Sequence, residues 1–131
     1  MEKLKVDGVT FELVHDSIIS ATWTGELTEA AVRTLHEYTL MVTERLGPEG
    51  IVKALVDARA ATGIAREARK QLTELGRDKH WDRVAFVGVS FPVKVLLELL
   101  AKALRLMKIE GSEVVFVDTP EHGLAWLLEH D

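Results

Sequence analysis

The amino-acid sequence predicts an α/β domain with a mixed sheet that starts with antiparallel strands and continues with parallel βαβ units. Three short β-favouring runs come before any helical pattern, and after them apolar runs of strand length alternate with helical spacings. The run Val84–Val89 (VAFVGV) is also nearly all apolar, which is typical of a strand covered on both faces. The whole chain, residues 1–131, has the length of one such domain.

Antiparallel strands are predicted at the N-terminus. The runs Val9–Val14 (VTFELV) and Ile18–Trp23 (IISATW) favour strands, and the polar trio His15-Asp16-Ser17 between them suits a hairpin turn. Together with the preceding Leu4–Val6, these runs predict an antiparallel start to the sheet.

The first helix is predicted to begin after Thr28, which suits an N-cap, with Leu27 and Val32 at the staple positions on either side. The residues of its inner face then recur at spacings of three and four: Val32, Leu35, Thr39, Val42 and Leu46. Gly47-Pro48 is expected to end this helix.

The rest of the chain alternates strands and helices. The further strands are predicted over Ile51–Val56, Val84–Val89 and Val114–Val117. The further helices are predicted on the face marked by Ile64, Ala68, Leu72 and Leu75, from about Pro92 to Lys108, and from Thr119 (N-cap) and Pro120 to Leu128. The order is therefore βββαβαβαβα, and right-handed crossovers make the last strands parallel with helices on both faces of the sheet.

Composition argues against several kinds of partner. The formal net charge of −5 is opposite to the concentrated basic surface that binds nucleic acid. Because the chain has no cysteine, it has no disulfide, thiolate zinc site or cysteine nucleophile, and we expect a cytoplasmic protein. The longest apolar-rich stretch, Val93–Ile109, is interrupted by charged residues, and the N-terminus has no apolar core of signal-peptide length, so we expect no membrane insertion.

No catalytic site, metal site or cofactor is predicted. Gly88-Val89-Ser90-Phe91-Pro92 is similar to the Gly-x-Ser-x-Gly turn of α/β-hydrolases, but Pro92 replaces the second glycine, so Ser90 is interpreted as a turn or cap residue. None of the five histidines has the helical spacing or the carboxylate neighbours that metal ligands require.

The helix predicted from Pro92 to Lys108 has more apolar surface than one core contact needs, because its polar stripe is narrow. A second copy, another protein or a lipid-like ligand held between this helix and the sheet would cover the excess, and so would neighbouring elements of the same chain. The candidate interface or cavity residues are Trp23, Trp81, Leu96, Leu100, Leu104 and Met107.

Five short motifs follow the predicted order of elements: Trp23–Thr28 (WTGELT), Ala54–Asp57 (ALVD), Trp81–Gly88 (WDRVAFVG), Val115–Asp118 (VFVD) and Ala125–Leu127 (AWL). With these motifs the chain resembles the SpoIIAA-like fold, which is shared by STAS domains and by small stand-alone bacterial proteins of unassigned function. The resemblance implies a SpoIIAA-like mixed sheet over nearly the whole chain.

The same resemblance makes Thr62 a candidate phosphoacceptor. In STAS anti-sigma-factor antagonists, a Ser or Thr at the start of the helix after the Asp-ended strand is phosphorylated by a partner kinase. Thr62-Gly63 occupies that position after Asp57, with Ala61 in place of the acidic residue of the family. A phosphate on Thr62 would lie at a helix N-terminus with Arg59 to assist it, whereas in the simpler interpretation Thr62 only caps the helix.

Ligands of open α/β sheets bind beyond the carboxyl ends of the parallel strands. In addition to Asp57, Arg59 and Thr62, those ends carry Ser90, Asp118 and Thr119, a polar set without a paired acid and base.

Two functional hypotheses follow. The first is a non-enzymatic SpoIIAA/STAS-like interaction or regulatory module that binds a protein partner and is dimeric through the helix from Pro92 to Lys108. The alternative is a carrier or sensor of a small apolar ligand, because the fold is similar in outline to the CRAL-TRIO fold.

Overall fold

A computed structural model of the chain describes residues 3–75, 81–106 and 113–129, without the side chains of residues 104–106. Six strands form one sheet in the order β1-β2-β3-β4-β5-β6. The strands are β1 (Leu4–Val6), β2 (Val9–Val14), β3 (Ile18–Leu27), β4 (Lys53–Ile64), β5 (Arg83–Val87) and β6 (Glu113–Val117). The helices are α1 (Glu29–Leu46), α2 (Arg66–Leu75), α3 (Phe91–Leu106) and α4 (Pro120–Glu129).

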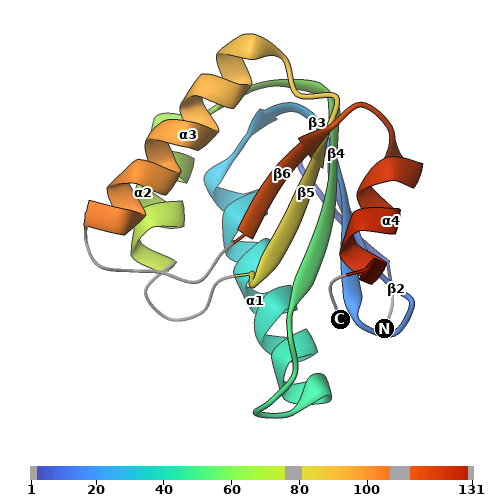
Figure 1. The fold of residues 1–131 in the computed structure, drawn as a ribbon. Helices are drawn as coiled ribbons and strands as arrows, with labels where there is room; N and C mark the ends of the chain where they lie inside the picture. The colour runs from blue at the N-terminus through green and yellow to red at the C-terminus, as the bar shows by residue number, and fades with distance from the viewer. Residues whose placement is uncertain (1–2, 76–80, 107–112, 130–131) are drawn as a thin grey trace.

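Strand pairing follows the predicted division of the sheet. β1 pairs with β2, and β2 with β3, in antiparallel ladders, while β3, β4, β5 and β6 pair in parallel. The predicted fold class and element order are therefore confirmed. Figure 1 shows α1, α2 and α3 on one face of the sheet and α4 alone on the other.

Two tight turns join the antiparallel strands. His15 and Asp16 have positive φ angles of 50° and 60°, which confirms the predicted turn between β2 and β3. Asp7 and Gly8 make the turn between β1 and β2, also with positive φ, and Asp-Gly is a favoured pair for such a hairpin. Gly8 lies so close to β3 that an added Cβ would come within 2.6 Å of the Thr24 carbonyl oxygen.

The hydrophobic core has two parts, one on each face of the sheet. The larger part joins the sheet to α1, α2 and α3, and its fully buried members include Phe11, Ile19, Val32, Tyr38 and Val93. The smaller part lies under α4 and consists of Ile18, Leu55, Ala85, Val87, Val117 and Leu127. The single helix α4 therefore covers the face of the parallel strands that the other three helices leave open.

The helix α4 lies close against the sheet. An added Cβ at Gly123 would come within 2.7 Å of Leu55 Cδ1, so any other residue here would require the Leu55 side chain to shift. At the other end of α4, the buried Lys53 donates from Nζ to the Leu127 carbonyl oxygen at 2.9 Å. A cation near a helix C-terminus interacts favourably with the helix dipole, so Lys53 ties this end of α4 to β4.

The caps of α1 and α4 agree with the prediction. Thr28 accepts a hydrogen bond on Oγ1 from the Ala31 N–H at 3.2 Å, and Thr119 accepts one on Oγ1 from the His122 N–H at 3.2 Å. Gly47 ends α1 with φ of 86° and donates its N–H to the Thr43 carbonyl oxygen. Among the described residues, none of the helices combines the length and the apolar composition needed to cross a membrane.

The strand β4 differs from the prediction. The sequence predicts a strand over Ile51–Val56 and places Ile64 on a helix, but the strand continues to Ile64 and α2 begins only at Arg66. This part of the prediction is wrong.

Two β-bulges in β4 explain the error. Pairing with β3 passes from Thr22–Asp57 to Thr24–Ala60, and from Gly25–Ala61 to Glu26–Gly63, so β4 gains one residue at each step. As a result, Ala58, Ala61 and Ile64 are all buried in the larger core at intervals of three residues. This interval imitates the spacing of a helix, although the backbone is extended.

Candidate functional site

The strands β5 and β6 end at the same level, beside Asp57 in the middle of β4, which continues past them to Ile64. We call the polar groups at this level the strand-end surface: Asp57, Arg59, Ser90, Asp118 and Thr119. Asp57 lies level with Val87, the last residue of β5, and Val87 lies level with Val117, the last residue of β6. Asp118 and Thr119 follow directly.

An ion pair occupies the part of this surface that β4 provides. Arg59 donates from Nε to Asp57 Oδ1 at 2.9 Å and from Nη2 to Asp57 Oδ2 at 2.6 Å. The Arg59 backbone N–H also donates to Asp57 Oδ1 at 3.2 Å. The Arg59 side chain remains 57% exposed, so the guanidinium is available to a partner on its outer side.

These contacts set the protonation of both groups. Hydrogen bonding from the Arg59 side chain lowers the pKa of Asp57 below its usual range, against the effect of partial burial, and the same contact raises the pKa of Arg59. Glu121 of α4 adds a second negative charge that acts on Arg59. A carboxylate held ionised by a two-point contact with arginine is poorly suited to act as a general base near neutral pH.

Gly88 lets the Arg59 side chain lie across the end of β5. Gly88 has a positive φ of 65° and donates its N–H to the Val117 carbonyl oxygen at 2.9 Å. An added Cβ would collide with Arg59 Cγ and lie 3.2 Å from Cδ. The glycine of the predicted elbow-like motif therefore provides room for Arg59 and does not support a nucleophile.

Ser90 and Thr119 hold the same position in two successive helices. Ser90 precedes α3, and its carbonyl oxygen accepts the Lys94 N–H at 2.9 Å, while Thr119 precedes α4 and caps it through its side chain. Ser90 is exposed. Asp118 is exposed as well.

Thr62 does not lie where the sequence places it. It is the extra residue of the second bulge of β4, and Ala65 precedes α2, with its carbonyl oxygen accepting the Arg69 N–H at 2.9 Å. Thr62 therefore does not cap α2, and a phosphate on it would lie outside the first helical turn, where the dipole acts. Arg59, expected to assist such a phosphate, is paired with Asp57. Phosphorylation of the exposed Thr62 stays a prediction.

An apolar stripe lies on the outer face of α3. Phe91, Val95 and Leu99 follow each other at four-residue intervals and are 78%, 38% and 58% exposed. We call these three residues the α3 stripe. Phe91 was absent from the predicted interface residues, although its place at the start of an unusually apolar helix is visible in the sequence.

The predicted interface residues lie in different surroundings. Trp23, a candidate for an interface or a cavity wall, is only 3% exposed and lies within the larger core. Trp81 is half-buried against the same core and donates from Nε1 to Thr39 Oγ1 at 3.0 Å. Leu96 and Leu100 are partly buried against this core, while the Leu104 side chain and Met107 lie outside the described residues.

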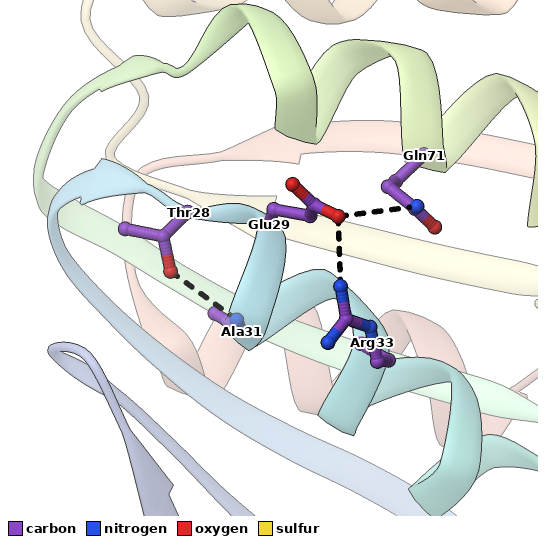
Figure 2. A network of polar contacts seen from close by, with 5 residues as sticks. All are labelled: Thr28, Glu29, Ala31, Arg33 and Gln71. Carbon is purple, nitrogen blue, oxygen red and sulfur yellow. Dashed lines mark hydrogen bonds and ion pairs between the residues drawn. The ribbon is translucent and has the colours of Figure 1, made fainter.

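A shallow depression of about 190 Å³ lies between α1 and α2, lined by Glu29, Glu67, Lys70, Gln71 and Glu74. Figure 2 shows two polar contacts of Glu29 beside it: Glu29 Oε1 accepts from Arg33 Nη2 at 2.7 Å and from Gln71 Nε2 at 3.4 Å. These contacts engage the carboxylate within the chain. Across residues 3–75, 81–106 and 113–129, no three side chains of the metal-binding types come together.

Comparison with protein-family models gives no match, and comparison with curated proteins gives none either. The solved structures that are similar to this chain include two proteins with a SpoIIAA-like fold. An uncharacterised protein of the DUF3478 family from Shewanella loihica PV-4, which has a SpoIIAA-like fold, matches with a TM-score of 0.58 and 23% sequence identity over 91% of both chains.

The anti-sigma factor antagonist SpoIIAA in its unphosphorylated form matches with a TM-score of 0.62 and 11% identity, over 94% of this chain and 99% of that one. Both matches extend over nearly all the elements described above. The six-stranded mixed sheet with its four helices is therefore a SpoIIAA-like fold.

Proposed function

We propose that this protein is a non-enzymatic interaction or regulatory module that associates with itself through α3 and binds a protein partner at the strand-end surface. The observation that carries the proposal is the α3 stripe, in which three consecutive apolar residues of one helix face are exposed. Contiguous exposed apolar side chains usually mark contact sites in soluble proteins.

The strand-end surface supports a binding role over a catalytic one. Asp57 and Arg59 satisfy each other, and no hydrogen bond among the described residues joins Ser90 to a base. Arginine is enriched at protein interfaces, and the exposed side of Arg59 lies at the same edge as Ser90 and Asp118. SpoIIAA, which has the same fold, is an anti-sigma factor antagonist, a role that depends on protein contact.

The alternative of an apolar-ligand carrier has less support. It requires Trp23, Trp81 and α3 to line a cavity, but Trp23 is enclosed in the larger core and Trp81 donates a hydrogen bond to Thr39. The proposal also places the protein in the cytoplasm, in keeping with its lack of cysteine.

Self-association is tested by light scattering over a range of protein concentrations. We expect a mass that rises toward two chains for the wild type and for Met41→Glu, which changes an exposed apolar residue of α1. We expect one chain for Leu99→Glu, because a charge cannot be buried unpaired in an apolar contact. A mass of one chain for the wild type at every concentration removes self-association from the proposal.

Partner binding is tested by affinity capture from an extract of the source organism with wild-type protein, Arg59→Glu and the control Arg33→Glu, which changes an exposed arginine of α1. A supporting result is a protein retained by the wild type and the control, lost with Arg59→Glu, and bound again when both purified components are mixed. If Arg59→Glu retains the same proteins as the wild type, the strand-end surface is not the binding site.

A further inference from the structure

We propose that α3 packs against the α3 helix of a second copy as an antiparallel pair with Val95 at the two-fold axis. This inference rests on the proposed function, because it specifies the geometry of the self-association described there. It is carried by the symmetry of the α3 stripe and by the charges beside it.

The α3 stripe is symmetric about its central residue. Phe91 lies four residues before Val95 and Leu99 four residues after it, so each is about 6 Å away along the helix. In an antiparallel pair, Phe91 therefore lies level with the partner's Leu99, and Val95 faces the partner's Val95. Such a patch is self-complementary, as a two-fold interface requires.

The charges beside the stripe favour the antiparallel arrangement. Lys94 and Glu98 form an ion pair of 4.0 Å along one side of the stripe, and their side chains are 44% and 60% exposed. Lys94 is one residue before the axis and the partner's Glu98 is three residues from it on the same side. These opposite charges are therefore about 3 Å apart along the helix direction.

A parallel pair would lack this attraction. It would place Lys94 and the partner's Glu98 on opposite sides of the stripe, and would bring together the two positive helix N-termini, which repel each other. Charge complementarity thus selects one direction of packing for the same apolar stripe.

The area of this contact sets the expected strength. The sixteen residues of α3 span about 24 Å, so a single pair of such helices buries less surface than a standard stable interface. We therefore expect a dimer that forms reversibly with rising concentration. Lys102 lies on the same face one turn beyond Leu99, and its long stem can extend past the end of the contact.

Single-cysteine variants test the geometry, because the wild-type chain contains no cysteine. Purified Val95→Cys, Phe91→Cys, Leu99→Cys and the control Met41→Cys are oxidised with copper-phenanthroline, and covalent dimers are measured on non-reducing gels. We expect Val95→Cys to form dimers fastest. Phe91→Cys and Leu99→Cys should form few dimers separately, and form them readily when the two variants are mixed.

Different results overturn the inference. If Phe91→Cys alone cross-links as fast as the mixture, the pair is parallel. If Val95→Cys cross-links no faster than Met41→Cys, α3 is not at the axis. A dimeric light-scattering mass with this second result would remove only the geometry, whereas a monomeric mass would remove the proposed self-association as well.

Charge exchange gives an independent readout. Lys94→Glu and Glu98→Lys each place like charges across the antiparallel pair, so each should raise the dimer dissociation constant by about tenfold, measured by sedimentation. The double variant restores opposite charges in both copies and should recover the wild-type constant. If the double variant is as weak as the single ones, the antiparallel pairing of Lys94 with the partner's Glu98 is wrong.

Discussion

Helices α3 and α4 each follow a strand of the parallel half of the sheet, but they meet the sheet differently. In α4, Leu127 is fully buried and Gly123 allows close contact with β4 and β5. In α3, Val93 is fully buried, whereas Phe91 and Leu99 are more than half exposed. The fold therefore uses more of the apolar surface of α4 than of α3, and the outer face of α3 remains exposed.

The largest effect on folding is expected for the inner face of α4. Leu127→Ala removes a fully buried side chain from the smaller core and should lower the free energy of unfolding by about 2–5 kcal/mol. Leu128→Ala changes the neighbouring residue, which is 41% exposed, and should cost about 0.5 kcal/mol or little more. Urea unfolding measures both, and equal losses would contradict the described packing of α4.

A somewhat smaller loss in the free energy of unfolding is expected for a substitution at Gly123, where α4 lies close against the sheet. Gly123→Val places new atoms against Leu55, Ala85 and Val117, and overpacking of this kind costs about 1–3 kcal/mol. Ala125→Val in the same helix is the control, because Ala125 is exposed and the substitution adds the same β-branched side chain. If both variants unfold at the same urea concentration, α4 does not lie close against the sheet at Gly123.

Removing the side chain before α4 should lower the free energy of unfolding by about 1 kcal/mol, and removing the one before α3 should lower it by less. Thr119→Ala removes the side-chain oxygen that accepts the His122 N–H. The loss of an N-cap of this kind usually lowers the free energy of unfolding by about 1 kcal/mol. No side-chain hydrogen bond of Ser90 is seen among the described residues, so Ser90→Ala should cost less. Thermal unfolding monitored by circular dichroism measures the stability of both variants. A lower melting temperature for Ser90→Ala than for Thr119→Ala would contradict this ranking.

Features that depend on neighbouring residues could be predicted from the sequence, whereas features that depend on distant residues could not. The cap of α4 depends on neighbouring residues, Thr119 and Pro120, so a local pattern was sufficient to place it. The bulges of β4 depend on its pairing with β3, which is distant in the sequence, and Ala58, Ala61 and Ile64 have a helical spacing. No local pattern distinguishes that spacing from a helix, so Thr62 was placed at a helix end.

The strand-end surface was predicted in part for a similar reason. The rule that parallel strands end at a common edge brought Asp57, Ser90 and Asp118 together from sequence alone. The contact of Arg59 with Asp57 depends on the first bulge, and on the room that Gly88 leaves at the end of β5. Likewise, the excess apolar surface of α3 was visible in the sequence, but which of its residues were exposed depended on how the helix is rotated against the sheet.

The smallest effect on folding is expected for substitutions on the outer face of α3. Leu99→Gln keeps a good helix former at a site that is 58% exposed, so the free energy of unfolding should change by no more than about 0.5 kcal/mol. Leu97→Gln on the inner side of the same helix is the matched control, since Leu97 packs against the larger core and its loss should cost about 1–3 kcal/mol.

Both variants must be unfolded at low protein concentration, because a dimer adds stability that depends on concentration. With rising concentration, the wild type and Leu97→Gln should gain stability while Leu99→Gln should not. If Leu99→Gln is as destabilised as Leu97→Gln when dilute, then the chain itself covers the stripe and α3 resembles α4. If Leu99→Gln instead gains stability with concentration as the wild type does, the second copy contacts another surface.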